Sequence, residues 1–371
     1  LAKAASGQPG TFATVPRAEV DLAALLYTSG TTGRSKGAMM THRNLLSNAE
    51  ALVDLWQIIA RDRLIHALPV FHTHGLFVAL NTALLAGAAV RLMGRFDLDQ
   101  VIAEIPRSTL MMGVPTFYTR LLDDPRLTRD LVAGMRLFIS GSAPLLAETH
   151  DAFAALTGHA ILERYGMTET NMIASNPYAG ARVAGTVGMA LPGVEVRLTD
   201  PESGAEAGPG AVGMIEVRGP NVFKGYWNMP EKTAADMRPD GFFITGDLGQ
   251  IDDAGYLRIV GRIKDLIISG GLNIYPKEIE DVLNEAPGVV ESAVIGLPDP
   301  DFGEAVMAAV VMAPGVALDE GALAGLVQAR LARFKHPRRY VALADLPRNA
   351  MGKVQKNALR AMFAAPPPQA R

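Results

Sequence analysis

The sequence predicts an α/β protein: a large domain with parallel-rich sheets and a β-rich subdomain, followed by a small α+β domain. Over residues 17–263, short apolar runs alternate with segments of helical period and with glycine turns, a pattern typical of α/β architecture. From about residue 192 to 260 this pattern gives way to alternating strands separated by Gly/Pro turns. About a hundred residues of mixed helix and strand pattern follow residue 262, which is the size of one small domain.

The expected elements can be placed along the chain in this order. In the α/β part, helical spacing predicts a helix over 42–55, and short apolar runs predict buried strands over 23–27, 64–68, 109–114 and 137–140. The β-rich part is expected to hold strands over 194–199, 213–218 and 256–260. The last part is expected to hold helices over 276–284 and 319–331 and strands over 289–296, 305–312 and 339–343. The expected domains are residues 1–263 and 264–363, with a flexible tail at 364–371.

Composition and charge exclude several classes of protein for this chain. The 371 residues include 35 Lys+Arg and 38 Asp+Glu, a net charge of -3, and 49% are hydrophobic, which predicts a folded soluble protein. With no cysteine, a disulfide framework and a thiolate nucleophile or metal site are excluded. The longest uncharged apolar stretch, residues 76–90, is shorter than the ~20 residues of a membrane helix, so no membrane insertion is expected. No signal-peptide pattern is visible, and a cytoplasmic location is expected.

A loop rich in glycine and hydroxyl side chains is the strongest chemical signal. Residues 27–37 read Tyr-Thr-Ser-Gly-Thr-Thr-Gly-Arg-Ser-Lys-Gly and follow an apolar strand. Glycines let backbone N–H groups converge on an anion, hydroxyls add donors, and Lys36 adds positive charge, so the loop is suited to phosphates. It is not a Walker loop, because Ser35 stands where the second glycine of that signature would be. A flexible linker is the alternative interpretation.

With this loop and six later motifs, the chain resembles the adenylate-forming superfamily of acyl-CoA synthetases, luciferases and peptide-synthetase adenylation domains. The motifs stand in order at residues 68–75 (Leu-Pro-Val-Phe-His-Thr-His-Gly), 140–144, 163–169, 243–247, 261–265 and 352–353. Family members carry a further N-terminal region before the phosphate loop, whereas only 27 residues precede Thr28 here. The resemblance therefore implies a large domain that is N-terminally incomplete.

The resemblance also implies a role for each matching residue. The phosphate loop would hold the β- and γ-phosphates of ATP through Thr28, Ser29, Gly30, Thr31, Thr32, Gly33 and Lys36. The adenine slot would comprise Gly141, Ser142, Ala143, Tyr165, Gly166 and Met167. Thr168 would bind the α-phosphate, Glu169 would hold Mg²⁺, Asp247 would bind the ribose, and Arg262 would support the same sugar or the phosphates.

Three further roles concern the small domain, which the resemblance implies is mobile. Lys353 would be the catalytic lysine, in preference to the neighbouring Lys356, because an ammonium group stabilises the charge that gathers when a carboxylate attacks ATP. Lys264 would be the hinge between two poses of the small domain. Ser269, Gly270 and Gly271 would line the path of CoA.

Arg164 is the residue that points to the acid substrate. Much of the family has a small uncharged residue before the Tyr-Gly pair, and a guanidinium beside the acyl pocket suits a second carboxylate with room for about one methylene. The motifs around residues 72–75 and 163–172 resemble malonyl-CoA synthetases in particular, with His72, Thr73, Arg164 and Met172 binding the acid. An ion pair of Arg164 with Glu163 or with another acid at the edge of the cleft is the alternative.

The expected function is an ATP- and Mg²⁺-dependent malonate:CoA ligase, which forms malonyl-CoA through malonyl-adenylate and releases pyrophosphate. The alternatives are a CoA ligase for methylmalonate or another short acid, an adenylation domain that serves a carrier protein, and a truncated, inactive nucleotide-binding protein. A zinc site at His72 and His74 lacks a third ligand of suitable spacing, and His74 is expected to pack or hydrogen-bond nearby. Residues 330–371 contain ten basic residues and one acid, but no nucleic-acid fold pattern, so no nucleic-acid partner is expected.

Overall fold

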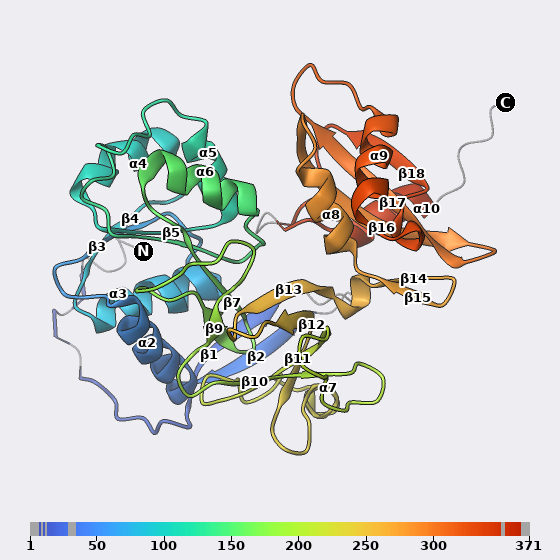
Figure 1. Cartoon of the computed structure of the whole chain (residues 1–371). Coiled ribbons are helices and arrows are strands. Elements are labelled where there is room, and N and C mark those ends of the chain that lie inside the picture. Colours follow the sequence, from blue (N-terminus) through green and yellow to red (C-terminus); the bar gives the residue numbers. More distant parts are fainter. Residues whose placement is uncertain (1–6, 9, 12, 29–34, 350–352, 365–371) are drawn as a thin grey trace.

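The computed structural model describes residues 7, 8, 10, 11, 13–28, 35–349 and 353–364. Four sheets organise this part of the chain (Figure 1). A seven-stranded sheet has the order β4-β3-β5-β6-β7-β8-β9, a four-stranded sheet the order β10-β11-β12-β13, and β1 and β2 form a two-stranded ribbon. The last five strands build a separate sheet. Four of them have the order β15-β14-β17-β16, and β18 pairs with β17.

The bounds of the elements are as follows. The strands are β1 (Leu22–Thr28), β2 (Lys36–Thr41), β3 (Arg63–His66), β4 (Ala89–Leu92), β5 (Leu110–Gly113), β6 (Leu137–Ser140), β7 (Leu162–Met167), β8 (Asn171–Ser175), β9 (Met189–Ala190), β10 (Glu195–Thr199), β11 (Gly213–Arg218), β12 (Phe243–Ile251), β13 (Leu257–Arg262), β14 (Ile267–Ser269), β15 (Leu272–Ile274), β16 (Val289–Asp299), β17 (Gly303–Met312) and β18 (Arg339–Leu343). The α-helices are α2 (His42–Trp56), α3 (Asn81–Leu85), α4 (Leu98–Glu104), α5 (Pro115–Leu122), α6 (Ala147–Thr157), α7 (Pro230–Asp236), α8 (Pro276–Asn284), α9 (Glu320–Arg330) and α10 (Lys356–Ala364). A π-helix, η1 (His74–Leu80), and three 3₁₀ turns, η2 (Ile105–Arg107), η3 (Ile263–Asp265) and η4 (Arg333–Lys335), complete the list.

The large sheet is the middle of three layers, and its core strands are parallel from β4 to β7. Successive side chains of a strand point to opposite faces. Thus Leu64 packs with Leu52 and Trp56 of α2, whereas Ile65 packs in the cluster formed with α4, α5 and α6. Figure 1 shows these helices on the two sides of the sheet. Because both faces are covered, the parallel strands read as continuous apolar runs, which is the reason that the sequence predicted them.

The C-terminal sheet is covered in the same way. Helices α8 and α9 pack on one face of β16 and β17, and α10 packs on the other. In Figure 1 these elements lie apart from the large sheet, joined to it through β13 and η3. The expected α/β architecture with a small α+β part at the C-terminus is confirmed. The expected domain boundary at residue 264 and the mobility of the small domain stay predictions.

Two expectations about the N-terminal strands need correction. Residues 22–28 form a strand as predicted, but it is not buried, because its only partner in the described part of the chain is β2 and its side chains alternate between exposed and half-buried. The run that follows the phosphate loop is a strand of its own, β2, before the helix begins at His42. The loop therefore connects two antiparallel strands, whereas it was expected to lead from a strand toward the helix. An apolar run indicates a strand but says nothing about what covers it.

None of the helices in the described ranges has the length and apolar character needed to cross a membrane. The expected cytoplasmic location stays a prediction. Of the predicted tail, residues 364–371, Ala364 ends helix α10 and residues 365–371 lie outside the described residues.

Candidate active site

Several of the predicted site residues lie at one edge of the large sheet. The carboxyl ends of parallel strands meet at the same edge, where ligands of α/β proteins bind. Residues 72–74 follow β3, Gly141 follows β6, and Arg164 lies in β7 next to it. The π-helix η1 begins at His74, and π-helical turns are frequent at functional sites. Local backbone and sheet order therefore bring three separate motifs together.

Arg164 is a buried cation with unused donors. Its side chain is buried, and its Nε and Nη2 have no hydrogen-bond partner among the described residues. Gly141 gives it room, because a Cβ at that position would stand 2.4 Å from the Arg164 Cζ. Burial lowers the pKa of Arg164 to about 9, so the guanidinium remains charged at neutral pH. A charge of this kind is costly to bury unless an anion pairs with it.

Other unsatisfied polar groups belong to the same motifs. Thr73 Oγ1, His74 Nε2 and Ser140 Oγ are buried and have no partner in the described part of the structure. His74 Nδ1 lies 3.1 Å from Ser142 Oγ, which agrees with the expectation that His74 makes a local hydrogen bond. Burial, with Lys353 and Arg164 nearby, lowers the pKa of His72 to about 4, so that its ring is neutral. Together these groups can receive an anionic ligand.

Arg164 does not form the alternative ion pair with Glu163 in the described part of the structure. Neighbouring residues of a strand point to opposite faces, and Glu163 Oε1 instead accepts a hydrogen bond from the Leu145 N–H at 3.2 Å. Burial raises the pKa of Glu163 to about 7.

The predicted ribose-binding residues form a connected group. The Tyr165 hydroxyl donates to Asp247 Oδ2 at 2.6 Å, and Arg262 Nε donates to Asp247 Oδ1 at 3.1 Å. Burial and the Asp247 carboxylate raise the pKa of Tyr165, which keeps its hydroxyl protonated as a donor. Two donors from different strands thus orient one carboxylate.

The phosphate hairpin is only partly described. Thr28 and Lys36 stand opposite each other where β1 and β2 end, so the hairpin tip lies between them. Ser29, Gly30, Thr31, Thr32 and Gly33, which were predicted to bind phosphate, lie outside the described residues.

Glu169, the predicted Mg²⁺ ligand, follows β7 and is 5% exposed. Its Oε1 accepts a hydrogen bond from the Tyr226 hydroxyl at 2.9 Å. No group of three or more His, Cys, Asp or Glu able to hold a metal occurs among the described residues. This donor set fits Mg²⁺, which proteins commonly hold through one or two carboxylates while phosphates and water fill the remaining positions.

Lys353 reaches this site from the C-terminal part of the chain. Burial and the Arg262 charge lower its pKa to about 8, and Asp247, Arg164 and Glu169 also act on it electrostatically. Lys356 behaves differently, because its Nζ forms an ion pair with Glu280 Oε1 at 2.6 Å. The geometry thus distinguishes the predicted catalytic lysine from its neighbour.

The remaining predicted residues fall into two groups. Ala143, Gly166, Met167 and Thr168 lie half-buried around the same strand ends, and Met172 is buried with its methyl group against Gly166, where a Cβ would stand 2.6 Å from Cε. Ser269, Gly270 and Gly271 instead form the turn of the β14–β15 hairpin, which projects away from β7 in Figure 1. The positive φ values of both glycines, 58° and 76°, suit a two-residue hairpin turn, so the turn alone accounts for them.

Lys264 lies in η3, between β13 and the C-terminal sheet. The next residue, Asp265, forms an ion pair with Arg360 of α10 at 3.1 Å. Burial lowers the pKa of Lys264. The position between two sheets is compatible with a hinge.

The basic residues near the C-terminus have local acidic partners. Among the described residues of this stretch, six of them pair with acids that precede residue 330: Arg330 with Glu285, Lys335 with Glu278, Arg338 with Asp299, Arg348 with Glu291, Lys356 with Glu280, and Arg360 with Asp265. The positive excess that suggested a nucleic-acid surface is therefore largely offset within the folded structure.

Sequence reasoning assigned no role to Ser140 or Tyr226. Ser140 stands in a motif that was recognised, and its burial at the end of β6 is what distinguishes it. Tyr226 lies 57 residues from Glu169 in sequence, and no local pattern indicates that the two meet.

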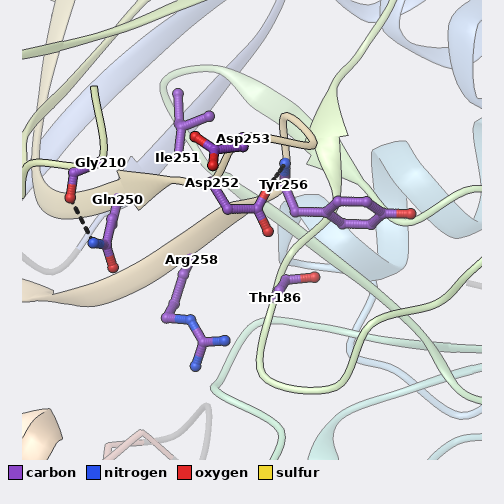
Figure 2. A pocket seen from close by; sticks show the side chains of 8 residues that line it. All are labelled: Thr186, Gly210, Gln250, Ile251, Asp252, Asp253, Tyr256 and Arg258. Atoms are coloured by element: carbon purple, nitrogen blue, oxygen red, sulfur yellow. Dashed lines mark hydrogen bonds between the residues drawn. The ribbon is translucent and has the colours of Figure 1, made fainter. Parts of the chain in front are cut away.

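A separate surface pocket of about 490 Å³ lies on the β12–β13 side of the molecule (Figure 2). It is lined by Thr186, Gly210, Gln250, Ile251, Asp252, Asp253, Tyr256 and Arg258. It contains none of the predicted site residues.

The fold and the site define an AMP-binding enzyme, and the chain belongs to this family. The family model of AMP-binding enzymes matches residues 2–227, and that of the AMP-binding enzyme C-terminal domain matches residues 278–353. The predicted membership of the adenylate-forming superfamily is confirmed.

Curated relatives include several CoA ligases. The malonate–CoA ligase of Arabidopsis thaliana is 39% identical over 92% of this chain and 60% of the relative. The long-chain-fatty-acid–CoA ligase of Bacillus subtilis is 37% identical over 93% of this chain and 63% of the relative. This chain spans about three-fifths of the length of the first curated relatives that it matches.

Among solved structures, ATP-bound MatB from Rhodopseudomonas palustris is 60% identical, with a TM-score of 0.95, and the match covers 98% of this chain and 72% of MatB. The apo form of MatB, at the same identity and coverage, gives a TM-score of 0.82. The arrangement of this chain is thus more similar to the ATP-bound form than to the apo form.

Proposed function

We propose that this chain acts as an AMP-forming acid:CoA ligase and that malonate is its acid. The observation that carries the substrate is the buried guanidinium of Arg164 with two unpartnered nitrogen donors. A carboxylate accepts two parallel hydrogen bonds from such a group. Malonate offers one carboxylate to Arg164 and leaves the other for reaction.

Sequence identity to the relatives does not distinguish between acid substrates, since a malonate ligase and a long-chain-fatty-acid ligase match at nearly the same identity. The pocket supports malonate, because an alkyl chain there would leave the Arg164 charge unpaired. Thr73 Oγ1, His74 Nε2 and Ser140 Oγ add groups that a carboxylate can satisfy and an alkyl chain cannot.

In the proposed reaction, the free carboxylate of malonate attacks the α-phosphorus of ATP, and the bond to the β-phosphate breaks to release pyrophosphate. The CoA sulfur then attacks the acyl carbon, and AMP leaves. Lys353 supplies positive charge as the two anions approach, and Asp247 accepts hydrogen bonds from the ribose. Glu169 would hold Mg²⁺, which neutralises phosphate charge. Residues 1–263 and 264–363 form the two domains of this proposal, hinged at Lys264, with Ser269, Gly270 and Gly271 beside CoA in the second pose.

The test compares acid-dependent pyrophosphate release with malonate, methylmalonate, succinate and acetate. Arg164→Met should lower kcat/KM for malonate by at least about 100-fold, because a buried carboxylate loses its charged partner. The value for acetate should change by less than about threefold, since acetate has no second carboxylate. Arg258→Met is the matched control, because Arg258 faces the separate pocket of Figure 2. An unchanged preference in Arg164→Met would refute malonate as the acid.

The same assay separates the alternatives. An adenylation domain that serves a carrier protein should release pyrophosphate with an acid but show no response to free CoA. A short-acid ligase of another specificity should prefer methylmalonate or succinate. An inactive nucleotide-binding protein should bind ATP and respond to no acid, both as this chain and when extended at its N-terminus to the length of its relatives.

A further inference from the structure

Tyr226 connects two predicted ATP-binding groups that come from distant parts of the chain. It lies between β11 and α7, is 3% exposed, and donates its hydroxyl hydrogen to Glu169 Oε1 at 2.9 Å. On its other side, Lys36 Nζ donates to the same hydroxyl oxygen at 3.5 Å. One hydroxyl thus lies between the lysine that ends the phosphate hairpin and the carboxylate predicted to hold Mg²⁺.

The surrounding backbone holds this tyrosine in place. Ala38 of β2 pairs with Tyr226 in an isolated β-bridge, and the Trp227 N–H donates to the Gly37 carbonyl at 2.8 Å. The ring packs edge-on against Phe223, with centroids 4.8 Å apart. The Phe223 N–H in turn donates to the Glu169 carbonyl at 2.8 Å. The position of the hydroxyl is therefore set by contacts that do not depend on the hydroxyl itself.

The direction of the hydrogen bond follows from charge. Burial and the Glu169 carboxylate raise the pKa of Tyr226, so the hydroxyl keeps its proton. The hydroxyl donates that proton to Glu169, Lys36 is itself a donor, and the Asp236 carboxylate is a second acid that acts on the hydroxyl. With Oε1 occupied, the orientation of the carboxylate is fixed and Oε2 is left for a cation. Groups that orient a metal ligand in this way typically change metal affinity by about 10- to 100-fold when removed.

We propose that Tyr226 is a positioning residue for Mg²⁺·ATP: its hydroxyl orients Glu169 toward the cation, whereas its ring, with Lys36 Nζ 4.6 Å from the centroid, holds that lysine beside the same site. This inference rests on the proposed function only for the binding of ATP, and it is independent of the acid. Tyr226 is not proposed to touch the reacting atoms.

The experiment measures ATP binding by calorimetry as a function of Mg²⁺ concentration, without any acid. In Tyr226→Phe, the ring and its contacts remain while the hydroxyl is lost. The Mg²⁺ concentration that gives half-maximal ATP binding should rise about tenfold. ATP affinity in EDTA should change by less than about threefold. Tyr256→Phe is the matched control, because that hydroxyl donates to the Ala181 carbonyl at 2.9 Å away from the site, and it should behave as the unmodified chain.

A second variant separates positioning from a general structural effect. In a Glu169→Gln background, Tyr226→Phe should cause little further change in Mg²⁺ dependence, because the group on which Tyr226 acts has been altered. Equal losses of ATP affinity with and without Mg²⁺, or an unchanged Mg²⁺ dependence, would overturn the inference. A chain that binds Mg²⁺·ATP as expected but releases no pyrophosphate with any acid would contradict the proposed function and leave the role of Tyr226 standing. Absence of ATP binding in the unmodified chain would overturn both.

Discussion

At the scale of single residues, the site concentrates cations before any ligand is present. Arg262 and Arg164 act on Lys353 electrostatically and lower its pKa, whereas Asp247 and Glu169 act in the opposite direction. Burial and the Arg262 charge disfavour the ammonium form of Lys353 and lower its pKa to about 8. Anionic phosphates attract these cations, so the binding of ATP should favour the charged form of Lys353.

This pKa predicts a pH profile. The protonated, charged form of Lys353 is the one that stabilises the transition state, and it is lost as the pH rises through about 8 in the free chain. The kcat/KM for adenylation should therefore fall above pH 8 with a slope of one proton, because kcat/KM reports the free enzyme. The decline in kcat should come at higher pH, since bound phosphates favour the ammonium form.

Lys353→Arg provides the check, because a guanidinium stays charged throughout this range. Its kcat/KM should be lower than that of the unmodified chain but should show no decline between pH 7 and 8.5, a range that lies below the pKa of about 9 of Arg164. Lys356→Arg, which alters the lysine paired with Glu280, should keep the original decline. If Lys353→Arg also keeps it, another group is responsible for the profile.

At the scale of elements, Asn44 shows how one side chain joins a helix to the site. Its Oδ1 accepts from the Thr41 N–H at 2.9 Å, and its own N–H donates to Thr41 Oγ1 at 3.2 Å, which closes a capping box at the start of α2. Its Nδ2 donates to the carbonyls of Pro220 and Val222 at 2.7 and 2.8 Å. Both carbonyls lie within three residues of Phe223, whose backbone N–H donates to the Glu169 carbonyl. The cap of α2 therefore also fixes the chain beside Glu169.

Asn44→Asp tests this double role. The carboxylate keeps the oxygen that caps the helix. Its second oxygen replaces the NH₂ group that donates to two carbonyls, so it faces carbonyl oxygens with no hydrogen to donate. The free energy of unfolding, measured with urea, should fall by about 1–3 kcal/mol. At the exposed cap of α4, Asp97→Asn should change it by less than about 0.5 kcal/mol, because Asp and Asn cap helices about equally well. Equal small effects at both positions would mean that the bonds to residues 220 and 222 contribute nothing.

The elements also show what the sequence could predict. The predicted bounds of β11, α8 and β18 agree with the structure, because caps, turns and periodicity are local signals. The exposure of β1 could not be predicted, since it depends on which elements pack over the strand. The same limit applies to the site: Arg164 is conspicuous because much of the family that the chain resembles has a small uncharged residue there, whereas Tyr226 acquires its importance only where the fold brings residues 36, 169 and 226 together.

At the scale of the whole molecule, the two parts of the chain make separate contributions to one site. Lys353 comes from the C-terminal part, and the groups that act on it most strongly belong to the first 263 residues. The similarity to ATP-bound MatB, with a TM-score of 0.95 against 0.82 for the apo form, supports the view that this arrangement suits the first half-reaction. In the proposed second pose, Lys353 leaves the site and the β14–β15 hairpin replaces it.

A variant of Lys353 should therefore separate the two half-reactions. Lys353→Ala should lower malonate-dependent exchange of pyrophosphate into ATP by at least about 100-fold, because the charge that stabilises the transition state is lost. Formation of malonyl-CoA from supplied malonyl-adenylate should stay within about threefold of the unmodified chain, since Lys353 has no part in the second pose. Lys356→Ala, which removes the ion pair with Glu280, should affect neither step selectively. Equal losses in both steps of Lys353→Ala would mean that a single pose serves both, and the proposed rotation about Lys264 would then have no role in the reaction.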